Sequence, residues 1–251
     1  MKYIKYFEQK ALYDNYISND SVLPNVSYTL DTNEVFYNKK KEIIANGVYI
    51  VDLKGNLLDP DTFTGTANDV TGIGLVTDNG SWIVALDEWY AGSNTDSTAW
   101  NGNKSAWGGY FKTVTGCFTP DSLTIAVTDF NGKSNTDAII AQLKGTTDEY
   151  SSSYTGAPAA EYCRAYSKGC KGVGEWYLPA IGELNEIGLN QDAINAILTK
   201  LGKNSLSENS STIWSSSQFN SLHAWRYNWS GSNWSNANKN YASGVRPVCA
   251  L

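Results

Sequence analysis

Two glutamates, Glu183 and Glu186, lie three residues apart in a segment whose apolar spacing predicts a helix over residues 181–201. Residues at this spacing share one helix face, so either carboxylate of the pair is a candidate for acid–base chemistry. The preceding run GEWYLP (residues 174–179) combines two aromatics, a leucine and a turn-forming proline, a composition typical of packing at a helix entry. We therefore expect both carboxylates to be solvated on an exposed helix face rather than catalytic.

Three consecutive serines at positions 215–217 precede His223, the one histidine of the chain. A nucleophilic serine needs a positioned base, and a single histidine inside a compositionally biased segment is weak support for such a pair. The glycines at positions 72, 74 and 80 form no dinucleotide fingerprint, and those at 108 and 109 form no phosphate loop. The sequence predicts no catalytic residues and no cofactor.

The cysteines Cys117, Cys163, Cys170 and Cys249 form no CxxC pair, so the sequence predicts no zinc site. Two alternatives stay open: four free thiols, or a Cys163–Cys249 bridge that would require an oxidising compartment. The acidic and Asn-containing stretches at 87–88 and 129–131 carry oxygen ligands suited to calcium. Neither completes a calcium-loop pattern, and we expect turn chemistry there and no metal.

The C-terminal segment, residues 212–251, has an unusual composition: TIWSSSQFNSLHAWRYNWSGSNWSNANKNYASGVRPVCAL. Asn, Ser, Trp and Tyr dominate, and the last acidic residue of the chain is Glu208. Flat aromatic rings provide contact area and short polar side chains provide adaptable hydrogen bonds, as in protein-binding loops. The tryptophans and the closing strand-like VRPV argue against low-complexity disorder, so we expect a folded, surface-displayed segment.

The length and net charge of the chain limit the possible classes of function. A chain of 251 residues forms one large or two small domains, and its net charge of −6 excludes a general nucleic-acid binder. The N-terminus has no uninterrupted apolar stretch and no small-residue cleavage site, so we expect no signal peptide. No segment is apolar enough for membrane insertion. We expect synthesis in the cytoplasm, with export as part of a larger particle as an open alternative.

Residues 1–69 are predicted to form a small β-rich unit. After a short amphipathic helix, strands are expected at 26–30, 34–37 and 47–51, with a hairpin turn at 31–33 and a second turn at 52–57. Residues 58–66 are rich in turn formers and are interpreted as a linker.

Residues 70–251 are predicted to form a second domain of α+β class. The Asp-Asn-Gly at 78–80 indicates a hairpin between strands 74–76 and 82–86. Helices are expected at 135–143, 157–166 and 181–201, the last bent or broken around 188–190. Strands are expected at 212–216, 224–229 and 245–250, with a turn at 230–233. In the strand 224–229, Trp225, Tyr227 and Trp229 share one face, and Ala224, Arg226 and Asn228 share the other.

These blocks carry a family resemblance. The segments GEWYLPAIGELNEIGLNQDAINAILTKLG, IWSSSQFN, AWRYNWSGSNW and GVRPV occur in an order that resembles the C-type lectin fold of the Lcl C-terminal domain type. IGLVTDNGSWIVALDEW and DFNGKSNTDAIIAQL are similar to that family's opening segments, so the resemblance runs from about residue 72 to 251. It implies two helices, small antiparallel sheets and long loops that present a ligand surface. C-type lectins often bridge the first helix to the last strand, where Cys163 and Cys249 occur here.

Within this group, the C-terminal segment most resembles the variable proteins of diversity-generating retroelements. In those systems a reverse transcriptase mutates adenines, and Asn codons are the main targets. The resemblance implies a fixed scaffold of Trp214, Trp225, Trp229, Trp234, Val245, Arg246 and Pro247. It also implies solvent-facing variable or ligand-binding positions at Asn220, Leu222, His223, Arg226, Tyr227, Asn228, Ser230, Ser232, Asn233, Ser235, Asn236, Ala237, Asn238, Asn240, Ser243 and Gly244.

A second resemblance, in the N-terminal segment, implies binding partners for the chain. VLPNVSYTLDTNEVFYN (residues 22–38) is similar to N-terminal segments of phage tail-associated proteins, which implies that the N-terminal unit attaches to a virion or forms a homo-oligomer. The expected function is non-enzymatic binding of a host-cell surface protein or glycan. Two alternatives are a fixed-sequence bacterial adhesin or carbohydrate-binding module, and an enzyme with a fold of the formylglycine-generating type. The paired catalytic cysteines of the latter are not evident.

Overall fold

The computed structural model describes residues 28–29, 35–36, 44–89, 106–147, 156–166 and 175–251. The chain divides into two compact units, residues 1–44 and 45–251. In the first unit, strands β1 (Tyr28–Thr29) and β2 (Val35–Phe36) pair in antiparallel fashion. This pairing confirms the predicted association of the first two strands, whereas their turn and the predicted N-terminal helix lie outside the described residues.

The boundary between the units lies 25 residues earlier than the sequence predicted, at 44/45 instead of 69/70. Strand β3 (Gly47–Asp52) belongs to the larger unit because it pairs with β5 (Val70–Thr77) from Gly47↔Val76 to Asp52↔Val70. The segment interpreted as a linker contains part of strand β4 (Leu57–Leu58) and leads into a short 3₁₀ helix, η1 (Ala67–Asp69). The strand pattern of 47–51 was predicted correctly, but its pairing partner lies beyond the proposed linker.

The first sheet of the larger unit has the strand order β10-β6-β5-β3-β4, and every neighbouring pair is antiparallel. Strands β5 and β6 (Gly80–Ala85) form the predicted hairpin around Asp78 and Asn79. Strand β10 (Val248–Ala250) returns from the end of the chain to pair with β6. The C-terminus is therefore built into this sheet.

In the described part of the chain, five α-helices follow β6 and precede the second sheet: α2 (Leu123–Ala126), α3 (Gly132–Leu143), α4 (Pro158–Ala165), α5 (Ile181–Leu189) and α6 (Gln191–Lys200). The three predicted helices are confirmed, including the break at Asn190 between α5 and α6. Helix α3 begins three residues before the predicted start. Proline at the first position of α4 suits a helix start, because its missing N–H would have no intrahelical partner there.

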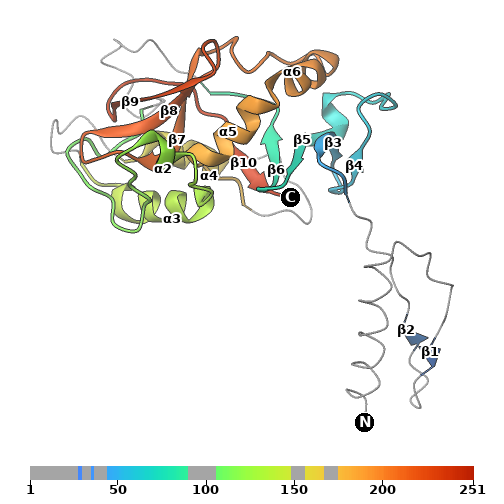
Figure 1. The fold of residues 1–251 in the computed structure, drawn as a ribbon, viewed down its shortest axis with the longest axis horizontal. Coiled ribbons are helices and arrows are strands. Elements are labelled where there is room, and N and C mark those ends of the chain that lie inside the picture. The colour runs from blue at the N-terminus through green and yellow to red at the C-terminus, as the bar shows by residue number, and fades with distance from the viewer. Residues whose placement is uncertain (1–27, 30–34, 37–43, 90–105, 148–155, 167–174) are drawn as a thin grey trace. The chain divides into compact units, whose positions relative to one another are not determined.

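The second sheet has the order β7-β8-β9, with strands β7 (Thr212–Gln218), β8 (His223–Asn228) and β9 (Asn233–Asn238). Helix α5 contacts both β7 and β8 (Figure 1). The main core joins the two sheets through α5 and α6, and it includes Ile73, Val84, Leu184, Ile194 and Trp225. A second cluster packs α3 and α4 around Trp107 and Trp214.

The protein is therefore an α+β protein with small antiparallel sheets. Elements α2, β4, η1 and β9 were not predicted from the sequence. Strand β9 was missed because Asn is a weak strand former and the conformation of this strand depends on pairing with β8. Among the described residues, no helix is long and apolar enough to cross a membrane.

Candidate binding surface

The β8–β9 hairpin organises most of the predicted variable positions. Its register is continuous from His223↔Asn238 to Asn228↔Asn233. Residues that oppose each other across an antiparallel pair lie on the same side of the sheet. The register therefore divides the hairpin into two faces, one containing Arg226 and its partner Ser235, the other containing Tyr227 and its partner Trp234.

The face that contains Tyr227 packs the hairpin against the core. Trp225, Tyr227 and Trp229 are all buried and belong to the main core. The Trp225 indole donates a hydrogen bond to Pro120 O at 3.1 Å. Gly188 of α5 lies so close that a Cβ there would stand 2.2 Å from the Tyr227 hydroxyl. The predicted face of Trp225, Tyr227 and Trp229 is thus confirmed as a packing face.

The opposite face is buried at one end and open at the other. Ala224 and Ala237 oppose each other and pack in the second cluster with Trp107 and Trp214. Further along, Arg226 is half-buried, and it donates from Nε to Ser235 Oγ at 3.1 Å and from Nη1 to Ser243 Oγ at 3.4 Å. Burial lowers the pKa of its guanidinium. Arg226 therefore stiffens the hairpin in addition to facing solvent.

Predicted variable positions fall into three groups by exposure. Tyr227, Ala237, Ser243 and Gly244 are buried, which contradicts their expected projection to solvent. Those that are partly exposed are Asn220, Leu222, His223, Arg226, Asn228, Ser235, Asn238 and Asn240, and those that are exposed are Ser230, Ser232, Asn233 and Asn236. We define the display positions as the six partly or fully exposed residues of the hairpin tip and β9, namely Ser230, Ser232, Asn233, Ser235, Asn236 and Asn238.

Gly244 shows why the buried positions cannot vary freely. A Cβ at Gly244 would lie 2.5 Å from Glu88 Oε1 and 2.9 Å from Ser210 Cβ. Its backbone N–H donates to Thr212 O at 2.8 Å, and its carbonyl accepts from Trp214 N at 2.9 Å. Gly244 is therefore part of the scaffold that covers the edge of β7.

Two asparagines of the predicted set shape turns. Asn220 Oδ1 accepts from the N–H groups of Leu222 and His223, both at 2.8 Å, between β7 and β8. Asn228 Oδ1 accepts from the N–H groups of Ser230 and Gly231 at 3.0 and 3.3 Å, between β8 and β9. Asn is favoured in such turns because its side chain bonds to the backbone two residues on.

Lys239 is a scaffold residue that sequence reasoning missed. It is fully buried, and its Nζ donates to Gln218 Oε1 at 2.6 Å and to Lys112 O at 2.7 Å. The ammonium also lies 4.5 Å from the centre of the Trp107 ring, a cation–π contact. A lysine between two asparagines in a polar segment gives no sign of this, since its partners lie up to 132 residues away.

Arg246 in the C-terminal segment forms a buried ion pair with Glu88, three residues after the end of β6. Arg246, predicted as scaffold, donates from Nη1 to Ala85 O at 2.8 Å, and its Nη2 lies 3.5 Å from Glu88 Oε2. The two side chains are 2% and 0% exposed. Burial raises the pKa of Glu88 to about 7, although Arg246 opposes the shift. Among the described residues, Glu88 Oε1 has no hydrogen-bond partner, so its charged form is costly in this structure.

The glutamates considered for acid–base chemistry are buried, contrary to expectation. Glu183 accepts from Ala180 N at 2.8 Å and from the Tyr177 hydroxyl at 3.3 Å, which holds the start of α5. Burial raises its pKa to about 8. Glu186 accepts from Asn79 Nδ2 at 2.9 Å, which joins α5 to the β5–β6 turn. Both carboxylates connect elements of the fold.

Serine, histidine and cysteine side chains likewise have structural partners. Ser215 Oγ donates to Trp225 O at 2.8 Å and Ser217 Oγ to Asp129 Oδ2 at 2.6 Å, while His223 Nδ1 lies 3.1 Å from Asn220 Oδ1. Cys163 is a free thiol, so the proposed bridge to Cys249 is not formed. Cys163 and Cys249 pack in separate hydrophobic clusters. Cys170 lies outside the described residues.

The acidic stretches considered for calcium are occupied by protein donors. Asp129 Oδ1 accepts from Asn131 N at 2.9 Å, and its Oδ2 accepts from Asn135 Nδ2 at 2.8 Å. Asp87 Oδ1 accepts from Lys203 Nζ at 2.7 Å. Throughout the part of the chain that the structure describes, no group of three or more His, Cys, Asp or Glu residues is placed to hold a metal ion.

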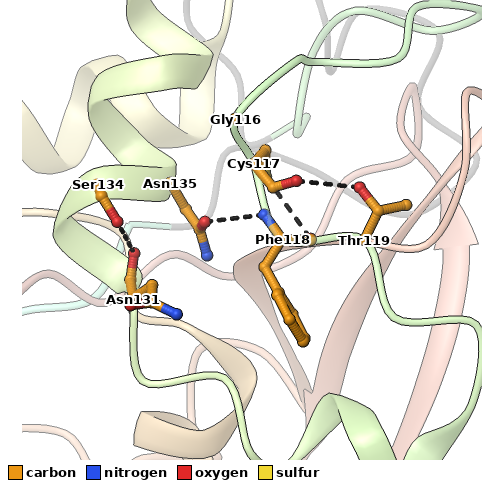
Figure 2. Close-up of a pocket in the computed structure, with 7 residues that line it drawn as sticks. All are labelled: Gly116, Cys117, Phe118, Thr119, Asn131, Ser134 and Asn135. Carbon is orange, nitrogen blue, oxygen red and sulfur yellow. Dashed lines mark hydrogen bonds between the residues drawn. The ribbon is translucent and has the colours of Figure 1, made fainter.

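Two cavities lie outside the hairpin. The first, of about 380 Å³, separates the 116–119 loop from the start of α3 (Figure 2). In it, Asn135 Oδ1 accepts from Phe118 N at 3.0 Å, and burial raises the pKa of Cys117 to about 12, which leaves the thiol protonated and unreactive. The second, of about 290 Å³, lies beside Asp87, Glu88 and Lys203. Neither cavity is lined by display positions.

Comparison with known proteins gives one structural likeness. No family model and no curated protein matches the chain. The solved structure of a fimbrial protein from Bacteroides ovatus superposes with a TM-score of 0.54 and 14% sequence identity. The match covers 83% of this chain and 49% of that protein, so the chain spans about half of its length. At this identity the likeness concerns the fold alone.

Proposed function

We propose that this chain is a non-enzymatic ligand-binding protein with a C-type lectin-like fold, whose C-terminal surface is varied by a diversity-generating retroelement. The observation that supports the proposal is that one hairpin has both a buried packing face and exposed polar positions. Trp225, Tyr227 and Trp229 fix it to the core, while the display positions carry short polar side chains at its tip and outer strand. Surface substitutions typically change stability by less than about 0.5 kcal/mol, so these positions can change without loss of the fold.

The proposed ligand is a protein or glycan on a host-cell surface, bound through the display positions with Arg226 as a neighbouring anchor. We propose that the N-terminal unit, residues 1–44, attaches the protein to a virion tail or supports homo-oligomerisation. A paired two-stranded element in that unit is compatible with either role.

A second candidate is a fixed-sequence surface adhesin, which the fimbrial neighbour favours. Both candidates use a rigid α+β scaffold to present a ligand surface. They differ in one respect: a fixed adhesin keeps its contact residues constant between isolates, whereas a retroelement changes them.

Randomising the display positions in the full chain should yield folded proteins with new binding specificities. We expect selection of this library against several unrelated immobilised proteins to recover binders with a different residue set for each target. Their melting temperatures should lie near that of the parent. A library that stays folded but yields no binder would contradict the proposal.

The matched control randomises scaffold positions on the same strands. We expect most of its members to be unfolded, because smaller side chains open cavities or remove buried contacts, and larger side chains at the buried alanines overpack the core. If members of the control library fold as often as members of the first library, the proposed distinction between display positions and scaffold positions is wrong. The control positions are Ala224, Trp225, Tyr227, Trp229, Ala237 and Lys239.

A further inference from the structure

The outer edge of β9 is a row of backbone groups that point away from β8. Lys239 N donates to Leu222 O at 2.9 Å, in the same register that pairs β8 with β9. Hydrogen-bonded and non-hydrogen-bonded pairs alternate along an antiparallel ladder, so Ala237 and every second residue before it bond to β8. The N–H and C=O groups directed outward are those of Trp234, Asn236 and Asn238.

These outward groups are uncovered in the described structure. Among them, Asn238 O accepts from Tyr241 N at 2.9 Å, and the others have no hydrogen-bond partner within the described residues. The opposite edge of the same sheet is covered, since Trp214 N of β7 donates to Gly244 O and Ser216 N donates to Pro179 O. Within the described residues, β9 is therefore the uncovered edge of this sheet and β7 the covered one.

Strand β9 also lacks the features that usually protect an edge. Natural edges carry charges, prolines or bulges that prevent pairing with another chain. The strand reads NWSNAN, with neither charge nor proline, and its register with β8 contains no shift. An extended segment can therefore approach β9 from Asn233 to Asn236 without burying a charge or meeting a bulge, while Asn238 O is already bonded to Tyr241 N.

We propose that the hairpin binds its ligand as an extended peptide segment that adds a fourth strand beside β9. This inference rests on the proposed function and names the ligand class of the same surface. Main-chain hydrogen bonds would provide affinity, and alternate side chains of β9 would provide specificity. The backbone N–H and C=O groups are the same for every residue type except proline, which lacks the N–H. The edge therefore gives every variant without proline on β9 the same attachment, while the display positions select among peptides.

A second copy of the chain fits this edge less well. Antiparallel pairing of two β9 strands about a two-fold axis at Asn236 would place display positions against each other. It would thereby exclude the ligand that the proposed function assigns to them. A peptide segment of another protein leaves the remaining display positions at the hairpin tip free to contact the same partner.

The test selects short linear peptides of random sequence against the full chain, alongside a glycan array. The selected peptides are then measured against two variants at one position. Asn236→Pro removes the outward N–H but no bond to β8, since residues 235 and 237 make those bonds. Asn236→Ala is the reference, because it lacks the same side chain but keeps the N–H. We expect affinity for Asn236→Pro to be at least about ten-fold weaker than for Asn236→Ala.

N-methylation of the peptide backbone gives a test without any protein variant. We expect methylation at alternate peptide positions to weaken binding, with a period of two. This pattern decides the question if Asn236→Pro unfolds. Methylation effects without that period, or equal affinity for two folded variants, would overturn the proposal.

The remaining outcomes separate this inference from the proposed function. Glycan binding without peptide binding would overturn the peptide class and leave the proposed function standing. A dimer in sedimentation that Asn236→Pro dissociates would show that a second copy occupies the edge, which also overturns the inference. Failure of the randomised library to yield any binder would overturn both.

Discussion

Trp229→Ala is expected to lower the free energy of unfolding by about 3–5 kcal/mol, the usual cost of truncating a buried tryptophan. Trp229 is 2% exposed and packs edge-to-face on Tyr227, with ring centres 4.8 Å apart. Its backbone N–H also donates to Ser211 O at 2.9 Å. Urea denaturation followed by tryptophan fluorescence and circular dichroism measures the change.

The control for this prediction is the next residue in the chain. Ser230 is exposed at the start of the turn, and Ser230→Ala should change stability by less than about 0.5 kcal/mol. A loss of under about 1 kcal/mol in Trp229→Ala would place this tryptophan outside the scaffold. The contrast between adjacent residues tests whether packing, rather than composition, separates fixed from variable positions.

Arg246→Met is expected to cost about 3–5 kcal/mol near pH 8, because it leaves the Glu88 carboxylate buried without its cation. The cost should be smaller near pH 5. Glu88 has a pKa of about 7 in the folded state against an ordinary 4.5, so the folded state holds the extra proton between these values. Its contribution to stability therefore falls as pH rises through this window, and more steeply without Arg246.

Denaturant titrations of the wild type and Arg246→Met at pH 5 and pH 8 measure this difference. The double variant Glu88→Gln/Arg246→Met removes the titrating group, and it should recover part of the loss at pH 8 with little dependence on pH. An equal cost of Arg246→Met at both pH values would mean that Glu88 does not titrate in this window. The ion-pair account of Arg246 would then be wrong.

Local patterns predicted most of the secondary structure. The hairpin of β5 and β6 follows from Asp78-Asn79-Gly80, and the break between α5 and α6 follows from the sequence around residues 188–190. The packing face of β8 follows from alternation of Trp225, Tyr227 and Trp229 with polar residues. In each case the signal lies within a few residues of the element that it specifies.

Long-range partners account for what the sequence did not reveal. Strand β9 forms because β8 supplies its partner, and Glu186 is buried because Asn79, 107 residues away, bonds to it. Lys239 is buried because Trp107 and Gln218 receive its ammonium. No spacing rule connects these positions, so an asparagine, glutamate or lysine with a structural role has the same local sequence as one that is solvated.

The candidate site contains fewer residues than the composition of the C-terminal segment predicted. Composition predicted a displayed C-terminal segment but treated nearly every Asn, Ser and small residue in it as equivalent. The structure divides them: Ser243 and Gly244 are buried, and Asn220 and Asn228 hold turns. The six display positions are at least partly exposed at the hairpin tip and on β9, and Leu222, His223, Arg226 and Asn240 are partly exposed elsewhere in the segment.

The most direct test of a variable surface on a fixed scaffold is to sequence this locus in related isolates. We predict that a near-copy of this coding segment lies beside a reverse-transcriptase gene. Differences between isolates should be concentrated in the codons of the display positions, at the sites where the near-copy has adenine. Trp225, Tyr227, Trp229, Gly244 and Arg246 should be constant. Differences spread evenly over the chain, or constant display positions without such a near-copy, would contradict the account.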